Sequence, residues 1–271
     1  MPAAGGTRHP PRRRRFGQHF LHDPAVIGRI VEALAPRAGE HLVEIGPGRG
    51  ALTRALLGFD GCTLDAIEID RDLATQLRAR FPPTAGWALH QGDALEFDYS
   101  ELAQRRGGRL RIVGNLPYNI STPLLFRLLA HAAAIADLTV MLQREVVARL
   151  TASPGDRDYG RLTVMLVPQT RIERLFDVGP GAFQPPPRVW SAVVRVTVRA
   201  APLFAVSPSF GAVVAAAFAQ RRKTLRNALS QLLSREQISA CGIDPAVRPE
   251  TLSAQAFNSL AEALDRSRAD R

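Results

Sequence analysis

The feature that most constrains the fold is an alternation of short apolar runs with segments of helical spacing between residues 16 and 142. Each apolar run has the length of a buried strand, and the intervening segments repeat their apolar residues at the helical period. Strands that alternate with helices predict a parallel sheet covered by helices on both faces, with ligands at the carboxyl ends of the strands. The predicted strands are residues 41–46, 63–70, 86–90, 111–115 and 138–142, and the predicted helices are 49–57, 71–81 and 122–131.

The pattern changes after residue 142. Residues 161–169 and 189–198 predict two further strands, whereas residues 209–233 are rich in Ala, Leu and Arg and predict helix. A last helical segment begins at Ser253 and carries Phe257, Leu260 and Leu264 on one face. We therefore predict a mixed α/β chain in three parts: a flexible basic tail over residues 1–15, a Rossmann-like domain over 16–200 and a small all-α domain over 201–271.

Composition narrows the classes of partner. Lys and Arg number 35 against 25 Asp and Glu, so the formal charge is +10, which favours a polyanionic partner. All but one of these cations are Arg. This ratio indicates a genome-wide bias in base composition and not selection for guanidinium chemistry. The longest small-apolar run, residues 211–219, is too short to cross a bilayer, so no membrane partner is expected. Cys62 and Cys241 have no CxxC or His neighbours, which predicts a cytoplasmic protein without a metal site.

A glycine-rich turn follows the first predicted strand. Gly46, Gly48 and Gly50 occur in the sequence Glu-Ile-Gly-Pro-Gly-Arg-Gly, and such a turn is shared by folds that bind NAD, FAD and S-adenosylmethionine. Glu68 ends the second strand, 20 residues after Gly48, where a carboxylate can bind ribose hydroxyls. Asp93 follows the third strand at the same edge. Each carboxylate taken alone is also compatible with a helix cap, but three such features in register predict a nucleoside site.

The end of the fourth strand favours methyl transfer over redox chemistry. It carries Asn115-Leu116-Pro117-Tyr118, in which the Asn115 amide oxygen and the Leu116 carbonyl can each accept one N–H of an adenine N6 group. Pro117 restricts Leu116 to an extended conformation and so fixes the direction of that carbonyl. Tyr118 can stack on the base. The same tetrapeptide is also an ordinary turn sequence.

The order of the motifs gives a resemblance to a known family. From about residue 16 to 264 the chain resembles the ribosomal RNA adenine dimethyltransferase family, and within it the small-subunit (16S) branch. The resemblance is carried by Phe-Gly-Gln-His-Phe-Leu at 16–21, Glu-Ile-Gly-Pro-Gly at 44–48, Glu-Ile-Asp at 68–70, Asp-Ala at 93–94, Gly-Asn-Leu-Pro-Tyr-Asn-Ile-Ser-Thr at 114–122, Gln-Arg-Glu-Val at 143–146, Tyr-Gly-Arg-Leu at 159–162, Phe-Gln-Pro-Pro-Pro-Arg-Val at 183–189 and Gln-Arg-Arg-Lys-Thr-Leu-Arg-Asn at 220–227.

The resemblance implies S-adenosylmethionine as the cofactor and stacking of the target adenine between Tyr118 and Phe183. Two positions depart from the family pattern: His19 stands where Asn is usual, and Trp190 stands where Asp usually precedes Ser191. A backbone contact at residue 19 would survive the first change. The implied site consists of Gln18, His19, Leu21, Gly46, Gly48, Glu68, Asp93 and Asn115 around the cofactor, and Asn115, Leu116, Pro117, Tyr118 and Phe183 at the acceptor base.

The resemblance also implies the substrate: two adjacent adenosines in the 3′-terminal hairpin loop of 16S rRNA, dimethylated at N6 within an immature small subunit. We expect in-line transfer to a flipped adenine by a monomeric enzyme. The stretch 220–227 predicts a helix that presents cations to this RNA, although a solvated helix face has the same composition. The predicted RNA-binding residues are Arg221, Arg222, Lys223 and Arg226.

Three other functions remain open at this point. A large-subunit rRNA methyltransferase of the antibiotic-resistance branch shares the core motifs, but the Phe-Gln-Pro-Pro-Pro block and the basic stretch favour the small-subunit branch. A mitochondrial transcription factor of the same fold would require a transit segment, and Pro10 and Pro11 argue against an amphipathic one. An assembly factor without activity is disfavoured because the predicted cofactor and acceptor residues are all present.

Overall fold

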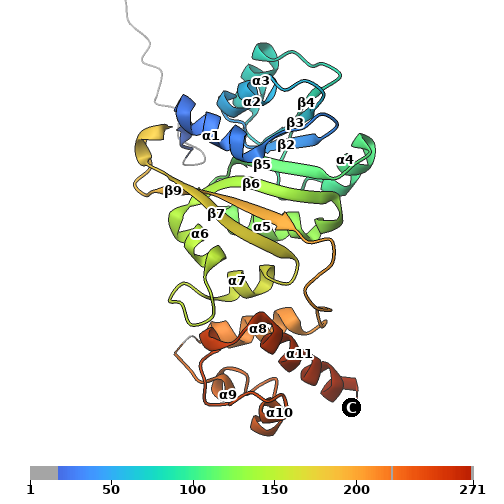
Figure 1. The fold of residues 1–271 in the computed structure, drawn as a ribbon, viewed down its shortest axis with the longest axis vertical. Helices are drawn as coiled ribbons and strands as arrows, with labels where there is room; N and C mark the ends of the chain where they lie inside the picture. The colour runs from blue at the N-terminus through green and yellow to red at the C-terminus, as the bar shows by residue number, and fades with distance from the viewer. Residues whose placement is uncertain (1–17, 221, 270–271) are drawn as a thin grey trace, which may run out of the picture.

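The protein is described by a computed structural model over residues 18–220 and 222–269, so the predicted tail at residues 1–15 lies outside the described part. A seven-stranded sheet in the order β4-β3-β2-β5-β6-β9-β7 forms its centre (Figure 1). Neighbouring strands are parallel from β4 to β6, and β9 is antiparallel to both β6 and β7. The strands are β1 Phe20–Leu21, β2 His41–Ile45, β3 Thr63–Glu68, β4 Trp87–Gln91, β5 Leu110–Asn115, β6 Ile135–Gln143, β7 Thr170–Val178, β8 Phe183–Gln184 and β9 Ser191–Val198.

Helices cover both faces of this sheet. Apolar side chains of α1 and α2 pack in one core with one face of the sheet, and those of α4, α5 and α6 pack in a second core with the other face. The predicted doubly covered sheet is thus confirmed. The helices are α1 Pro24–Leu34, α2 Ala51–Leu56, α3 Arg71–Arg80, α4 Tyr99–Arg106, α5 Ser121–Ala130, α6 Arg144–Thr151, α7 Arg161–Leu166, α8 Phe210–Ala219, α9 Leu225–Ala228, α10 Arg235–Ala240 and α11 Ala254–Ala269, with 3-10 turns at Ala132–Ala134, Pro180–Ala182 and Pro249–Thr251.

The five strands predicted before residue 142 all form, with ends shifted by a few residues. Strand β2 pairs with β3 on one side and with β5 on the other, so it occupies the middle of the parallel part of the sheet. This order brings the carboxyl ends of β2, β3, β4 and β5 to one edge of the sheet. The residues that follow these four strands are the ones that the sequence marks as a nucleoside site.

One predicted strand is wrong. Residues 161–166 form the helix α7 and residues 167–169 a turn, because Val164 packs into the apolar core formed by the C-terminal helices. Thr163 Oγ1 donates to the Arg149 carbonyl at 2.5 Å and ties α7 to the end of α6. Short apolar runs fit either period, and here the tertiary partner decides. The strand beside β9 at the edge of the sheet is β7, Thr170–Val178, which the sequence pattern does not predict.

The C-terminal segment is helical, as predicted, and gathers beyond α7 at one end of the molecule (Figure 1). Phe210, Phe257 and Leu260 are among its buried residues, and Tyr159 from the preceding loop donates to the Leu252 carbonyl at 2.8 Å. The last apolar core therefore recruits residues from before position 200, while the predicted domain boundary there stays a prediction. Among the described residues, no helix combines the length and the apolarity that crossing a membrane requires.

Candidate active site

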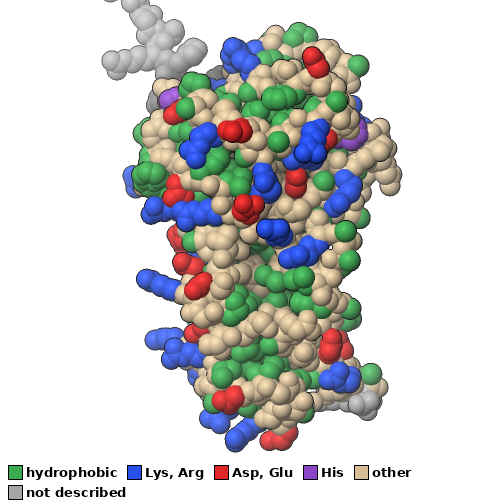
Figure 2. All heavy atoms as spheres, in the orientation of Figure 1, with side chains coloured by type: hydrophobic (Ala, Val, Ile, Leu, Met, Phe, Trp, Pro, Cys, Tyr) green, Lys and Arg blue, Asp and Glu red, His purple; other side chains and the backbone are tan. Residues whose placement is uncertain are grey.

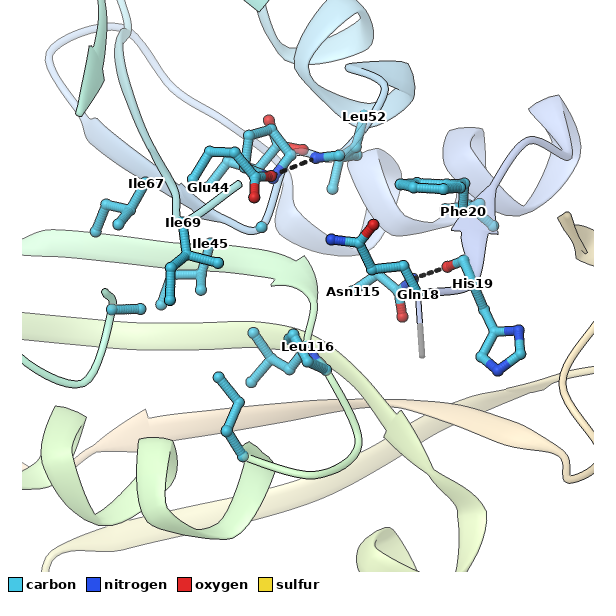
Figure 3. A pocket seen from close by; sticks show the side chains of 18 of the residues that line it. Gln18, His19, Phe20, Glu44, Ile45, Leu52, Ile67, Ile69, Asn115 and Leu116 are labelled. Carbon is cyan, nitrogen blue, oxygen red and sulfur yellow. Dashed lines mark hydrogen bonds between the residues drawn. The ribbon is translucent and has the colours of Figure 1, made fainter. Parts of the chain in front are cut away.

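A cavity of about 270 Å³ lies at the carboxyl edge of the parallel strands. It is lined by the ends of β2, β3 and β5, by the loop after β4, and by the segment around β1. In Figure 3 the segment around β1 closes one end of the cavity and Ile67 and Ile69 lie at the other. The lining includes the predicted residues Gln18, His19, Leu21, Gly46, Gly48, Glu68, Asp93, Asn115, Leu116, Pro117 and Tyr118.

The glycine-rich turn has a backbone that only glycine adopts easily. Gly46, Gly48 and Gly50 have φ angles of +67°, +58° and +75°. A Cβ atom added to Gly48 would stand 2.9 Å from the Phe20 ring, so the turn and the segment around β1 approach each other too closely for a side chain. Helix α2 consequently begins at Ala51, two residues later than the predicted start. The turn leaves backbone exposed to the cavity.

Glu68 connects the second strand to the glycine turn. Its Oε2 accepts from the Gly48 amide at 3.1 Å, and its Oε1 accepts from the Asp70 amide at 2.9 Å. The side chain is buried, and burial raises its pKa despite these two donors. Each oxygen keeps a second lone pair for a ligand hydroxyl. Glu68 thus has a structural contact, to the turn, that the sequence does not predict.

Asp93 lies at the same edge, after β4. Its Oδ1 accepts from the Leu95 amide at 2.9 Å, which fixes the carboxyl group against the start of the next turn. Among the described residues, no hydrogen bond uses Oδ2. Ile69 and Ala94 supply apolar surface beside the two carboxylates, and Ile69 is 48% exposed although it is a large aliphatic residue. Carboxylates flanked by apolar surface suit a nucleoside, whose hydroxyls and base need these two environments.

Glu44 is a buried carboxylate of the cavity that the sequence does not single out. It is 2% exposed, and its Oε2 accepts from Thr53 Oγ1 of α2 at 2.6 Å. Burial raises the pKa of Glu44 to about 7, repulsion from Glu68 adds to the rise, and the Thr53 hydrogen bond opposes it. A carboxylate that belongs to the first strand's apolar run gives no signal in the sequence except its polarity.

Asn115 connects the acceptor turn to the segment around β1. Its Nδ2 donates to the His19 carbonyl at 2.9 Å (Figure 3), so its Oδ1 is left as an acceptor that no described residue engages. Tyr118 Oη and Ser191 Oγ are 2.7 Å apart and hydrogen bonded, and burial raises the pKa of the Tyr118 phenol. The arrangement offers an amide oxygen and the Leu116 carbonyl to an amine, beside an oriented and neutral phenol.

The His19 side chain is turned away from a ligand role. Its Nδ1 lies 2.7 Å from the Pro185 carbonyl, and its ring centroid is 5.9 Å from that of Tyr118. The backbone of residue 19 makes the contact with the acceptor turn, while its expected contact with the cofactor stays a prediction. Its imidazole instead ties the segment around β1 to the proline-rich segment that follows β8.

Phe183 is not in the cavity. Strand β8 pairs with β1 so that Phe183 stands opposite Leu21, and the Phe183 ring is 2% exposed inside the core that α1 and α2 share. The structure therefore differs from the predicted arrangement, in which this ring faces Tyr118 across the base. Burial of the apolar Phe183 ring is favourable and holds β8 against β1. The segment that includes β8 therefore supports the segment around β1.

The predicted basic helix over 220–227 is also wrong in its local structure. Helix α8 ends at Ala219, Arg222 and Lys223 lie in a turn, and Arg226 belongs to the short α9. The helix is interrupted here because the Arg226 amide donates to the Pro245 carbonyl at 3.0 Å and not to a carbonyl of a preceding helical turn. These three cations are exposed and form no ion pair with a described residue. Arg221 lies outside the described residues.

Fold and cavity together define a class. The first parallel strand ends in a glycine turn, the next two are followed by carboxylates, and the fourth is followed by an Asn-x-Pro-Tyr turn. A protein with this fold and site is an S-adenosylmethionine-dependent methyltransferase. The residues present fit that cofactor. Glu68 and Asp93 would hold its ribose, the apolar wall at Ile69 its base, and the glycine turn its amino-acid end.

Comparison with known proteins gives the family. The sequence profile of ribosomal RNA adenine dimethylase matches residues 11–266, and the chain belongs to this family. Two similar proteins, from Pseudomonas aeruginosa and Methylococcus capsulatus, are each named ribosomal RNA small subunit methyltransferase A. The first is 55% identical over 93% of this chain and 94% of its own length, and the second is 52% identical over 95% and 99%.

Two solved structures are similar over almost the whole chain. A dimethyladenosine transferase from Plasmodium falciparum has a TM-score of 0.75 at 22% identity and covers 92% of this chain and 98% of its own. The 23S rRNA methyltransferase ErmE has a TM-score of 0.69 at 27% identity and covers 91% and 99%. The first likeness concerns the fold alone. The family profile itself extends to residue 266 and so includes the C-terminal helices.

Proposed function

We propose that this enzyme transfers methyl groups from S-adenosylmethionine to N6 of two adjacent adenosines in the 3′-terminal hairpin loop of 16S rRNA, giving N6,N6-dimethyladenosine. The observation that carries the proposal is the orientation of the Asn115 amide. Its nitrogen is committed to the His19 carbonyl, so its oxygen is available to accept from an amine. An exocyclic amine with two N–H donors, as in adenine, matches this oxygen and the neighbouring Leu116 carbonyl.

The chain's own groups make N6 reactive. Its lone pair is delocalised into the adenine ring, and two acceptors that engage its N–H groups out of the ring plane favour a pyramidal nitrogen with a localised lone pair. Tyr118, held by Ser191, stacks on the base and fixes its distance from the cavity. When bound, S-adenosylmethionine supplies an electrophilic methyl group for in-line attack. N6 then loses a proton to solvent, and Phe183 has no part in this proposal.

The acceptor must leave its stack to reach the turn at residues 115–118. A base in an RNA hairpin loop leaves the stack at lower cost than a paired base. Two adjacent adenosines with two methyl groups each require four transfers, and the cofactor must be exchanged between them. The site is compatible with repeated exchange, because the cavity opens at the edge of the sheet and is not enclosed between domains.

Basic side chains support an RNA surface larger than one hairpin. Arg222 and Lys223 are exposed in the turn after α8, Arg226 is exposed on α9, and Arg221 is their neighbour in sequence. Figure 2 shows Lys and Arg side chains along the whole length of one face, interspersed with Asp and Glu. A surface this extended suits a folded ribosomal particle, since a single loop offers few phosphates. We therefore infer that the substrate is an immature small subunit, bound by a monomer through a helical RNA-binding domain at 201–271.

A large-subunit substrate is the second candidate, and the likeness to ErmE favours it. Against it stand the two relatives named for the small subunit, which are about twice as similar in sequence. Identity above half over nearly the whole chain includes the C-terminal helices, where a subunit-specific contact is expected. The small subunit is therefore the substrate that we propose.

The test uses labelled cofactor and three substrates: unmethylated small subunits, large subunits and protein-free rRNA. After incubation, the RNA is digested and its nucleosides are separated. We expect labelled N6,N6-dimethyladenosine in the small subunits, at two neighbouring positions of the 3′-terminal hairpin. Label in large-subunit RNA alone would reject the proposal in favour of the second candidate. Label in none of the three would reject both.

A further inference from the structure

Trp190 is a large aromatic residue that the proposed acceptor and cofactor sites do not use. It is 48% exposed, and the adjacent Val189 is exposed as well, whereas the other tryptophan, Trp87, is 2% exposed. Single exposed apolar residues are common on protein surfaces and need no explanation. Two consecutive ones at the edge of a sheet that carries an active site call for one.

The position of Trp190 is fixed by its neighbours. Strand β9 begins at Ser191, whose register partner is Gln143 at the carboxyl end of β6, so Trp190 lies just beyond the ligand-binding edge of the sheet. Ser191 is bonded to Tyr118, which makes Trp190 the sequence neighbour of the residue that holds the acceptor phenol. The Arg144 amide donates to the Trp190 carbonyl at 2.9 Å and anchors this backbone to the start of α6.

The indole lies near Gly179 on one side and is half exposed. A Cβ atom added to this glycine would stand 3.6 Å from the six-membered ring, an ordinary van der Waals distance, so residue 179 is a close neighbour of the ring. About half of the Trp190 surface stays open to solvent. An indole has only two side-chain torsions, so a planar group can stack on it with little loss of side-chain freedom.

One arginine lies beside the indole in space and another lies close to it in sequence. The Arg144 guanidinium carbon is 5.9 Å from the ring centroid, and Arg188 precedes Trp190 by two residues. Both arginines are exposed, and neither forms an ion pair with a described residue. An exposed aromatic ring beside an unpaired cation, with a second cation close in sequence, suits single-stranded nucleic acid, because the ring stacks on a base while the cations neutralise adjacent phosphates.

We propose that Trp190, assisted by Arg144 and Arg188, stacks on an unpaired base that neighbours the target adenine in the RNA loop. This inference rests on the proposed function and names a subsite of it. A loop whose target base enters the turn at residues 115–118 exposes the bases on either side, and Trp190 lies at the same edge of the sheet. Trp190 is thereby a substrate-binding residue, remote from the transferred methyl group.

Fluorescence tests the stacking directly. Because Trp87 is buried, the exposed indole supplies the part of the tryptophan emission that a bound base can quench. The full-length protein is titrated with an RNA hairpin whose loop holds two adjacent unmethylated adenosines, and binding is followed independently by filter retention. We expect quenching that saturates with binding in the wild type and is lost in Trp190→Phe. Unchanged wild-type emission at saturating RNA would overturn the proposal.

Kinetics on unmethylated small subunits test the contribution to substrate binding. Trp190→Leu should raise KM by about fivefold to a hundredfold, the range for loss of one stacked base, with little change in kcat. Trp190→Tyr should recover most of the affinity. Phe59→Leu is the matched control, because Phe59 is an exposed aromatic residue in the loop after α2 and should leave KM unchanged. Equal KM values for Trp190→Leu and the control would refute the subsite.

One further outcome tells whether the partner of Trp190 is a base or a ribosomal protein. Another tells whether the stacking subsite or the proposed substrate has failed. If Trp190→Leu weakens binding to whole subunits but not to the protein-free hairpin, a ribosomal protein covers the indole and the proposal fails. If the wild type methylates no small-subunit RNA but the hairpin still quenches Trp190, the proposed substrate fails and the stacking subsite stands. Thermal unfolding of each variant identifies any that is destabilised, in which case Trp190→Tyr and the fluorescence titration decide.

Discussion

Glu44 allows a test of how much a buried carboxylate in the cavity lowers the free energy of unfolding. Burial raises the Glu44 pKa from 4.5 to about 7 in the folded protein. As pH rises above 4.5, the unfolded chain ionises this group while the folded protein does not, so the free energy of unfolding falls until pH exceeds the folded pKa of about 7. Above that pH the loss in free energy of unfolding is constant. A difference of one pKa unit corresponds to about 1.36 kcal/mol, so the total loss is about 3 kcal/mol.

The perturbation is Glu44→Gln, which removes the charge and keeps an oxygen to accept from Thr53. We expect the variant to be more stable than the wild type by about 3 kcal/mol at pH 8 and by less than about 1 kcal/mol at pH 5. Urea unfolding followed by circular dichroism at both pH values measures the difference. Because the two proteins share all other groups, the difference between their free energies of unfolding reports on residue 44.

The same substitution should affect the cofactor. S-adenosylmethionine carries a net positive charge, which the ionised Glu44 attracts and the neutral form does not, so wild-type affinity should rise with pH between about 6 and 8. Glu44→Gln should bind more weakly and lose this dependence in calorimetric titrations. A variant with wild-type stability at pH 8, or an affinity that keeps the wild-type pH profile, would refute the reasoning from burial.

Three further predictions concern the remaining parts of the site. Glu68→Ala should weaken S-adenosylmethionine binding by about 1 to 3 kcal/mol, since it removes a charged acceptor and frees the glycine turn; unchanged calorimetric affinity in a folded variant would exclude Glu68 from the site. Asn115→Ala should lower the single-turnover transfer rate far more than cofactor affinity, and a wild-type rate would end its assigned role. Neutralising Arg222, Lys223 and Arg226 together should reduce the slope of log RNA affinity against log salt by about one for each lost phosphate contact; an unchanged slope would make them a solvated surface.

The parallel strands and the site residues after them follow from the sequence for a physical reason. Strands that are buried on both faces must be largely apolar, and runs such as residues 138–142 meet this condition. Parallel order then brings Glu68, Asp93 and Asn115 to one edge without any side-chain information. This part of the site is a property of topology.

The features that the sequence does not predict depend on tertiary partners. Residues 161–166 fit a helix or a strand equally well until the C-terminal core claims Val164. Strand β7 lies at the sheet edge, where its charged side chains can be solvated, so it lacks the apolar signature of its neighbours. Phe183 is an aromatic residue beside prolines in sequence, and only the pairing of β8 with β1 shows that its ring belongs to the core.

The hydrogen bond between Asn115 and residue 19 has a consequence for the choice of base. A side-chain amide has an accepting end and a donating end, and rotation by half a turn exchanges them. With the His19 carbonyl in place, the donating end is occupied, and the turn presents an acceptor suited to the N6 amine of adenine. Without that carbonyl, the amide could equally present a donor, which suits the O6 carbonyl of guanine. Under the proposed function, a main-chain group therefore sets the discrimination between the two purines. A side-chain substitution at residue 19 leaves that group in place, which is compatible with histidine at this position.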